Sequence, residues 1–387
     1  MFEILDNQHN GTIIKVIGVG GAGGNAVDHM IRNGVGGVEF IVANTDAQAL
    51  ARSMTKSQIQ LGGTGLGAGA KPEAGRAAAM EQRDAIREAL QGAHMCFITA
   101  GMGGGTGTGA APIVAEIAKD MGILTVAVVT KPFAFEGKRM RAAEAGIEEL
   151  QQHVDSLIVI LNEKLMEVLG DDVSMKDAFR AADDVLHNAV AGIAEIINCP
   201  GLVNVDFEDV KTVMGEMGMA MMGSSYASGV DRARIAAEQA VASPLLEGVK
   251  LSGARGVLVN ITASDALKMR EVNEVMNTVR SFAAEDATII FGAVYDDSMG
   301  DNLRVTVVAT GLGQQAQRAS KPHLIVNQQT HQRTGTDNLV AGYEYEYATA
   351  EAAPAVFRKN RSSAVEALSQ SGMDKYDIPA FLRKQAD

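Results

Sequence analysis

The stretch Gly103-Gly104-Gly105-Thr106-Gly107-Thr108-Gly109 decides how the rest of the chain is interpreted. An apolar run over residues 94–100 precedes it, and a helical pattern follows from about residue 110. With five glycines among its seven residues, the stretch can turn several backbone N–H groups toward one concavity, which binds anions. The two threonines add hydroxyl donors. A flexible linker is not expected inside a strand–helix unit, so the stretch predicts a phosphate-binding loop.

A second glycine-rich stretch, Gly18-Val-Gly-Gly-Ala-Gly-Gly-Asn25, lies between an expected strand at 12–19 and an expected helix at 25–32. It fits GxGxxG, in which glycine lets the backbone approach a pyrophosphate at a helix N-terminus. With Glu39 or Asp46 for a ribose contact, this stretch alone favours an NAD-dependent oxidoreductase. Two phosphate loops on neighbouring strands instead favour a triphosphate. No GxxxxGKS or GxxxxGKT occurs, which excludes a P-loop NTPase.

Apolar runs that predict strands alternate with helical patterns over residues 1–173. The runs cover residues 12–19, 38–43, 94–100, 123–130 and 157–161. Strands that are apolar on both faces, in such alternation, indicate a parallel sheet with helices on both sides. The prediction is therefore an α/β, Rossmann-like domain whose ligand lies at the carboxyl ends of the strands.

After this domain the pattern predicts a long central helix over 174–200, a smaller α+β C-terminal domain over 201–312, a disordered linker over 313–372 and a C-terminal peptide over 373–387. Ser174 is a plausible cap for the helix, and Pro200-Gly201 ends it. In the α+β domain, strands at 288–295 and 303–309 flank a turn that we expect to close a hairpin. The methionine-rich run 214–222 predicts adaptable core packing.

Composition narrows the class of protein. A net charge of −13 argues against a nucleic-acid-binding surface, because the phosphate backbone is bound by excess Lys and Arg. No apolar run approaches the roughly 18 residues that cross a bilayer. We therefore expect a cytoplasmic protein that meets membranes only through a partner.

The glycine loop at 103–109 resembles the signature of the tubulin/FtsZ family of GTP-binding proteins. Further stretches that resemble this family are 18–25, 44–50, 101–112, 130–133, 204–209, 251–260, 304–310 and 377–387. The last of these resembles the FtsZ branch in particular. The resemblance implies a tubulin-type GTPase that binds GTP with Mg²⁺ and polymerises head to tail into the filaments of the bacterial division ring at mid-cell.

The resemblance also implies a nucleotide site. Its residues are Gly21, Ala22, Gly23, Gly24, Asn25, Asn44, Gly103, Gly104, Gly105, Thr106, Gly107, Thr108, Gly109, Glu136, Arg139, Phe179 and Asp183. Phe179 would stack on guanine. Asp183, four residues on and so on the same helix face, would accept from guanine N1–H and the exocyclic amine, a donor pair that adenine lacks. Glu136 and Arg139 would contact ribose and phosphate, but the following stretch is one residue short, so Arg141 is an alternative to Arg139.

Hydrolysis is assigned by the same resemblance to Asn204, Asp206 and Asp209. In the family this loop enters the nucleotide site of the next subunit, so that hydrolysis requires polymerisation. Carboxylates spaced i, i+3 can both face one point, where they would polarise a water molecule. The alternative for these residues is an ordinary helix cap, and the corresponding alternative function is a filament that binds GTP without hydrolysing it.

The C-terminal peptide is expected to bind partners. Its candidate contacts are Asp377, Ile378, Pro379, Phe381, Leu382, Arg383 and Lys384. Pro379 could start a short helix that presents apolar side chains to a partner groove. The resemblance implies docking to membrane tethers of the FtsA and ZipA types and to division inhibitors.

Overall fold

Ten strands form one sheet in the part of the chain that the computed structural model describes. The described residues are 11–170, 172–198, 205–215, 218–243, 254–284 and 287–312. They all lie within one compact unit, Met1–Lys321. The expected linker at 313–372 and the expected peptide at 373–387 lie outside the described residues.

Six parallel strands make the first part of the sheet. In spatial order they are β3 (Ser57–Gln60), β2 (Val38–Asn44), β1 (Ile14–Val19), β4 (Met95–Gly101), β5 (Leu124–Lys131) and β6 (Ser156–Leu161). The predicted α/β arrangement is therefore confirmed. The chain order reverses between β1 and β4, and ligands bind outside the carboxyl ends of strands at such a reversal.

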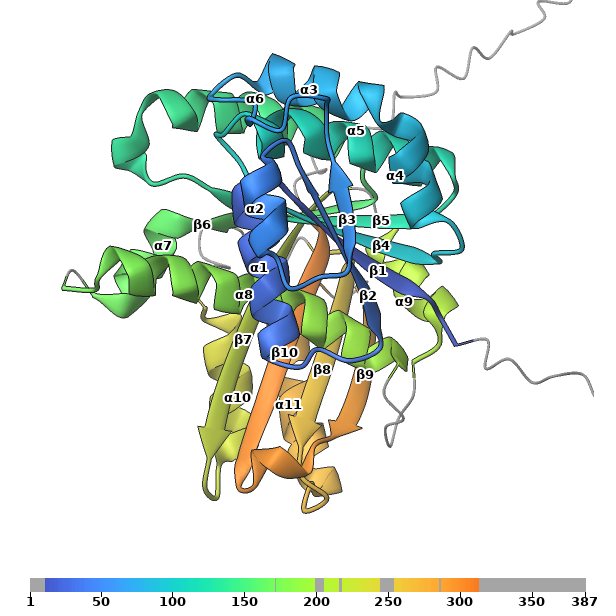
Figure 1. Ribbon diagram of the computed structural model, residues 1–387. Coiled ribbons are helices and arrows are strands. Elements are labelled where there is room, and N and C mark those ends of the chain that lie inside the picture. The colour runs from blue at the N-terminus through green and yellow to red at the C-terminus, as the bar shows by residue number, and fades with distance from the viewer. Residues whose placement is uncertain are drawn as a thin grey trace, which may run out of the picture. The chain divides into compact units, whose positions relative to one another are not determined.

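Helices cover both faces of these strands (Figure 1). They are α1 (Gly20–Arg32), α2 (Ala47–Arg52), α3 (Pro72–Glu81), α4 (Arg83–Leu90), α5 (Thr106–Asp120), α6 (Lys138–Gln151), α7 (Asn162–Leu169) and α8 (Met175–Asn198), with a short 3₁₀ turn, η1 (Ala134–Glu136). Side chains alternate across a strand, so Val16 of β1 packs with α1 and α8, whereas Ile17 packs with α3, α4, α5 and α6. Two buried apolar layers result.

Among the described residues, no helix combines the length and apolar character that a bilayer crossing requires.

The second part of the sheet is mixed. Its strands, in spatial order, are β7 (Gly218–Ser228), β10 (Asn302–Leu312), β8 (Gly256–Ala263) and β9 (Thr288–Tyr295), and its helices are α9 (Phe207–Met214), α10 (Arg232–Val241) and α11 (Met269–Phe282), with a 3₁₀ turn, η4 (Asp297–Met299). β7 pairs with β6 from Ser156↔Gly218 to Ile158↔Ala220, which makes the sheet continuous. The sequence did not predict β7. Met214, Met221 and Met222 are buried, as the core-packing interpretation expects, whereas Met219 of the same run is 37% exposed and departs from it.

The expected hairpin between residues 288–295 and 303–309 is wrong. β9 pairs with β8 in parallel, and β10 pairs antiparallel with β8 on its other edge. β8 therefore lies between the two strands. After β8 the chain crosses over through α11, and this crossover places β9 parallel to β8 at the outer edge of the sheet. The chain must then pass the end of β8 before it forms β10 on the other side. The polar segment that looked like a hairpin turn contains η4.

A buried ion pair fastens α8 to the second part of the sheet. Arg304 of β10 donates to Glu195 Oε2 at 2.5 Å, and Asn260 of β8 donates to the same oxygen at 3.0 Å. The Arg304 side chain is 10% exposed. Removing one member of a buried pair leaves an uncompensated charge, which is costly.

We predict that Glu195→Ala lowers the free energy of unfolding by about 3 kcal/mol, because the Arg304 guanidinium stays buried without its anion. Glu274→Ala is the matched control, since it also removes the partner of an arginine, Arg270, whose side chain is 84% exposed. Its cost should stay below about 0.5 kcal/mol. Urea unfolding of the nucleotide-free protein measures both, and equal costs would contradict the assignment of Glu195–Arg304 as a stabilising pair.

Candidate nucleotide site

A cavity of about 230 Å³ opens at the reversal of strand order, outside the carboxyl ends of β1, β4 and β5. Its lining residues are Val19, Gly21, Ala22, Gly69, Gly101, Met102, Gly104, Gly105, Thr106, Gly107, Thr130, Pro132, Glu136, Arg139, Asn162 and Phe179. Residues from both glycine-rich stretches therefore meet at one site. This is the place that the predicted sheet topology favours for a ligand.

Two helix N-termini point at this cavity. α1 begins at Gly20 and α5 begins at Thr106, each directly after a cavity-forming strand or loop. The described structure shows no side-chain cap and no acidic residue in the first turn of either helix. Their first N–H groups are free to bind an anion, and the helix dipoles favour negative charge there.

Both helices begin earlier than the sequence predicted. The expected starts were residues 25 and 110, because glycine disfavours helix formation and obscured the first turns. Since Gly20–Asn25 and Thr106–Gly109 are helical, the N–H donors belong to regular helix ends rather than to long irregular loops. An anion bound there would meet a preformed site.

Most of the loop glycines are required by close backbone packing. A Cβ on Gly107 would lie 2.5 Å from Gly101 O, and one on Gly105 would collide with Gly69 O. Gly103 has φ +96°, which favours glycine. Thr108 is buried, and its Oγ1 accepts a hydrogen bond from Gly103 N–H at 2.8 Å. These contacts fix the shape of the loop, so Thr108 supports the site rather than lining it.

Gly21 and Gly104 have no such reason to be glycine. A Cβ on Gly21 would meet no described atom within 4 Å, and one on Gly104 would meet only the Arg139 guanidinium at 3.9 Å. Neither residue has a positive φ of the kind that requires glycine. Both line the cavity. Their missing side chains leave room for a group that approaches the backbone closely, as a phosphate chain does.

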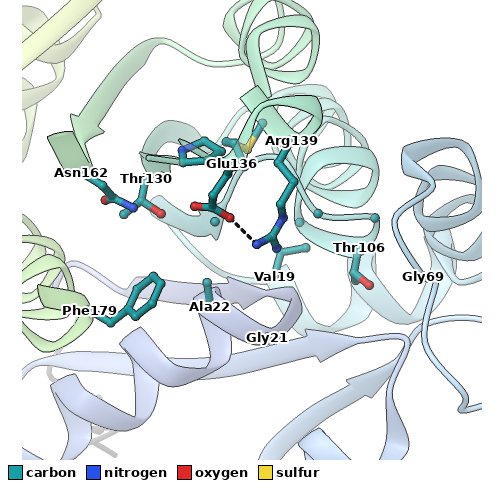
Figure 2. A pocket seen from close by; sticks show the side chains of 16 residues that line it. Val19, Gly21, Ala22, Gly69, Thr106, Thr130, Glu136, Arg139, Asn162 and Phe179 are labelled. Atoms are coloured by element: carbon teal, nitrogen blue, oxygen red, sulfur yellow. Dashed lines mark hydrogen bonds and ion pairs between the residues drawn. The ribbon is translucent and has the colours of Figure 1, made fainter. Parts of the chain in front are cut away.

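Glu136 and Arg139 lie together at the middle of the cavity (Figure 2). Arg139 Nη1 donates to Glu136 Oε2 at 2.5 Å, and Phe133 N–H donates to Glu136 Oε1 at 3.1 Å. The carboxylate is thus held by its neighbours, and the arginine supplies positive charge beside the two helix ends. Of the two candidates left open by the sequence, Arg139 lines the cavity and Arg141 does not.

An aromatic and an amide side chain mark one end of the cavity. Phe179 of α8 is 45% exposed and stands edge-on to Phe133, with ring centroids 5.8 Å apart. Asn162, at the start of α7, is buried, and its Oδ1 has no hydrogen-bond partner in the described structure. Figure 2 shows this end opposite Thr106 and Gly69. A buried amide oxygen without a partner, beside an aromatic face, is suited to a planar heterocycle with polar edges.

Asn162 was missed by the sequence analysis. Its signal was its position directly after β6, at the carboxyl end of a strand that flanks the cavity. Such positions carry binding residues in doubly wound sheets. Asn162 belongs to no motif and has no characteristic spacing from other polar residues, so the sequence did not distinguish it from the other asparagines of the chain.

Asp183 lies one helical turn beyond Phe179 on α8 and does not line the cavity itself. Its carboxylate has no hydrogen-bond or ion-pair partner among the described residues. Burial raises the pKa of Asp183 to about 6, against opposition from His29 and with a further contribution from Asp184. A half-buried carboxylate without a partner is destabilising, and it is the kind of group that functional sites retain.

Other predicted site residues lie around the cavity rather than in its lining. These are Gly23, Gly24, Asn25, Asn44, Gly103, Thr108 and Gly109. Asn44 is buried at the end of β2, where its Oδ1 accepts from Asp46 N–H at 3.2 Å. A Cβ on Gly23 would collide with Thr99 O, and one on Gly109 would collide with Pro72 O. These residues shape the elements that carry the lining residues.

Asp206 and Asp209 lie at the other end of the sheet. Asp206 caps α9 by accepting from Asp209 N–H at 2.8 Å, and both side chains are exposed. The adjacent Phe207 contacts His94, with ring centroids 6.2 Å apart, directly before the first residue of β4. β4 has 7 residues and spans roughly 20 Å at about 3.3 Å per residue, so the cavity lies about that far away. Asn204 lies outside the described residues.

Two family models match the chain. The model of the tubulin/FtsZ family GTPase domain matches residues 13–170, and that of the FtsZ family C-terminal domain matches residues 218–313. Relatives named cell division protein FtsZ, from Pseudomonas aeruginosa and Neisseria meningitidis, are 55% and 52% identical over 397 residues. These alignments cover all of this chain and 100% and 98% of the relatives.

Solved structures of FtsZ and of a related protein are similar to this chain. A structure described as an empty FtsZ dimer from M. jannaschii matches with a TM-score of 0.76 and 45% identity, over 80% of this chain and 90% of that one. CetZ2 from Haloferax volcanii, described as a GTPγS-bound protofilament, matches with a TM-score of 0.65 and 21% identity, over 78% and 94% of the chains. The second match concerns the fold alone.

We predict that Gly21→Ala and Gly104→Ala weaken binding of GTP, the ligand expected from the sequence, by about tenfold or more, because each methyl group occupies the space beside the helix N-termini. Stability should not fall, since alanine meets no close neighbour at either position. Gly36→Ala is the control, because it is equally open but lies away from the cavity. Calorimetric titration together with thermal unfolding tests the prediction, and unchanged GTP affinity in both variants would contradict it.

Proposed function

The chain belongs to the tubulin/FtsZ family, and from that membership we propose that it hydrolyses GTP at a site completed by a second copy of itself. It is a GTP-binding, tubulin-like GTPase with a role in cell division. The NAD-dependent oxidoreductase and the filament without hydrolysis are thereby set aside. Self-association follows from the family relationship, and the head-to-tail geometry is the part that we propose.

The proposed placement of GTP follows the polarity of the cavity. The phosphates lie against the N-termini of α1 and α5, where free N–H groups and the space above Gly21 and Gly104 receive them. The guanine lies at the end marked by Phe179 and Asn162. The ribose then lies between these ends, next to Glu136 and Arg139.

Guanine rather than adenine is selected by hydrogen-bond chemistry. The Asp183 carboxylate, which has no hydrogen-bond or ion-pair partner among the described residues, accepts from N1–H and from the exocyclic amine of guanine. Adenine presents an acceptor at N1 and would leave the carboxylate unpaired, and such a mismatch discriminates strongly in a partly buried site. Asn162 Oδ1, which has no hydrogen-bond partner in the described structure, adds a second acceptor for the base.

Mg²⁺ is proposed as the companion of the nucleotide. The described residues contain no group of three or more His, Cys, Asp or Glu side chains that could hold a metal ion by themselves. The cavity carboxylate, Glu136, is already engaged by Arg139. The phosphate oxygens would therefore be the main ligands, and Mg²⁺ would supply neutralisation of phosphate charge.

The separation of Asp206 and Asp209 from the cavity carries the proposal of hydrolysis between copies. Both carboxylates lie beyond the amino end of β4, whereas the cavity lies at its carboxyl end. One chain cannot bring them to its own nucleotide. Head-to-tail stacking brings α9 of one copy against the cavity of the next, and the two exposed carboxylates then orient the attacking water.

We predict that Asp209→Ala and Asp206→Ala each abolish GTP turnover but retain GTP-dependent assembly, because the cavity is unchanged. Light scattering and phosphate release, measured together, test this. Asp206→Ala also removes the cap of α9, at a cost of about 1 kcal/mol, so Asp206→Asn, which preserves a cap, is included. Normal turnover in the purified Asp209 variant would contradict the proposal.

A mixing experiment separates hydrolysis between copies from hydrolysis within one. Asp209→Ala keeps an intact cavity, and Asp183→Ala keeps the intact α9 end. Each variant alone should be inactive, and an equimolar mixture should recover part of the wild-type turnover. No recovery, although light scattering shows that the variants assemble together, would place all catalytic groups in one chain.

We propose that the C-terminal peptide, residues 373–387, docks to membrane tethers and division inhibitors, and that this docking holds the filaments at mid-cell. We predict that deletion of 376–387 leaves GTP turnover unchanged and abolishes binding to a purified membrane tether of the ZipA type. The double change of Phe381 and Leu382 to alanine should reproduce the loss, whereas Gln385→Ala should not. Retained binding by the deletion variant would contradict the docking role of this segment.

A further inference from the structure

Thr45 follows the last residue of β2 and does not line the cavity, yet it contacts a residue that does. It is 4% exposed, and its Oγ1 lies 2.6 Å from Oγ1 of Thr106, the first residue of α5. Two hydroxyl oxygens at this separation share a short hydrogen bond. The nucleotide placement proposed above gives this contact no role.

The backbone around Thr45 is held by the segment that follows β3. Thr45 O accepts from Gly67 N–H at 3.0 Å, and Asn44 O accepts from Leu61 N–H at 2.8 Å. A threonine side chain has few rotamers on a fixed backbone, because its Cβ is branched. Thr45 therefore presents its hydroxyl to α5 before any ligand binds.

The two hydroxyl groups together have two protons, and the contact uses one of them. Either oxygen could be the donor. If Thr106 donated, the buried Thr45 hydroxyl would keep a proton with no acceptor among the described residues, which is costly. If Thr45 donates, its proton is satisfied and the proton of Thr106 is free for another acceptor. The second arrangement is therefore favoured.

The free proton of Thr106 lies where the proposed placement puts the last phosphate. Thr106 is half-buried and lines the cavity, and Figure 2 shows it with Gly69 at the end opposite Phe179. With guanine beside Phe179, the phosphate farthest from the base lies at Thr106. An ionised phosphate oxygen accepts hydrogen bonds, and a hydroxyl that donates to it makes a strong, charge-assisted bond.

On the basis of the proposed function, we propose that Thr45 is a positioning residue that makes Thr106 a donor to the terminal phosphate and so favours GTP over GDP. Thr45 donates to Thr106 Oγ1, and Thr106 donates to the phosphate. Thr45 itself does not touch the nucleotide. Because GDP lacks the terminal phosphate, this pair of hydrogen bonds strengthens the binding of GTP alone.

The test compares Thr45→Val, which removes the hydroxyl and keeps the shape, with Thr45→Ser, which retains a hydroxyl. Calorimetric titration of the full-length, nucleotide-free protein measures GTP and GDP affinity, at concentrations where light scattering and phosphate release stay at baseline. We expect Thr45→Val to bind GTP about fivefold more weakly, the effect of about one hydrogen bond. Its GDP affinity should equal that of the wild type, and Thr45→Ser should bind both nucleotides like the wild type.

Thr55→Val is the matched control. Thr55 is also buried, and its Oγ1 donates to Phe40 O at 2.8 Å, but it does not line the cavity and has no contact with Thr106. This variant loses a buried hydroxyl of the same kind, so its ratio of GTP to GDP affinity should stay unchanged. Thermal unfolding checks that each variant is folded, and Thr45→Ala, which also lacks the hydroxyl, replaces Thr45→Val if valine is not accommodated.

A double-mutant cycle tests whether Thr45 acts through Thr106. In a Thr106→Val background, Thr45→Val should lower GTP affinity no further. A merely structural role for Thr45 would weaken GTP and GDP binding alike, and its effect would persist in that background. Either result overturns the inference, and so does wild-type GTP affinity in Thr45→Val.

Thr106→Val alone separates this inference from the proposed function. If Thr106→Val weakens GTP binding while Thr45→Val does not, only the inference fails. If Thr106→Val binds GTP like the wild type, the placement of the phosphates fails as well.

Discussion

Close contact between backbones, which only glycine permits, is the constraint on which the nucleotide site depends. A Cβ on Gly20 would lie 2.9 Å from Gly107 N, so α1 and α5 meet across a gap that has no room for a side chain. The same applies where α3 meets α5, since a Cβ on Gly109 would collide with Pro72 O. Because of these contacts, two helix N-termini converge on one cavity. Their dipoles and free N–H groups then add at a single place.

Recognition of the base imposes a second constraint on the structure, and this one lowers the stability of the folded protein. Asp183 is kept half-buried, without a partner in the part of the chain that the structure describes. Burial raises its pKa and makes the folded, nucleotide-free protein less stable at neutral pH. The neighbouring polar groups reduce the effect without removing it. A bound guanine would supply the missing donors, so binding and stability are coupled through one carboxylate. Functional sites often retain a group of this kind, whereas a protein selected for stability alone would replace it.

The sequence predicted the α/β fold because five of the six parallel strands are largely apolar runs that alternate with helical patterns. It did not predict β3, whose residues Ser57–Gln60 are mostly polar. It predicted the meeting of both glycine stretches, since parallel strands place their carboxyl ends at one edge. It did not predict where α1 and α5 begin, because helix propensity counts glycine against a helix even when packing requires it. It also failed for β9 and β10, since a polar turn between two strands does not reveal a third strand inserted between them. Asn162 was missed because its importance comes from burial without a partner, which no sequence pattern shows.

The placement of Asp206 and Asp209 at one end of β4 and of the cavity at the other has a consequence for kinetics. If each site is completed by the next copy, a filament of n copies contains n − 1 complete sites. The terminal cavity keeps its nucleotide intact until another copy arrives. The rate of GTP turnover is then proportional to the number of interfaces rather than to the number of molecules. The rate of phosphate release per molecule therefore increases with the mean length of the filaments.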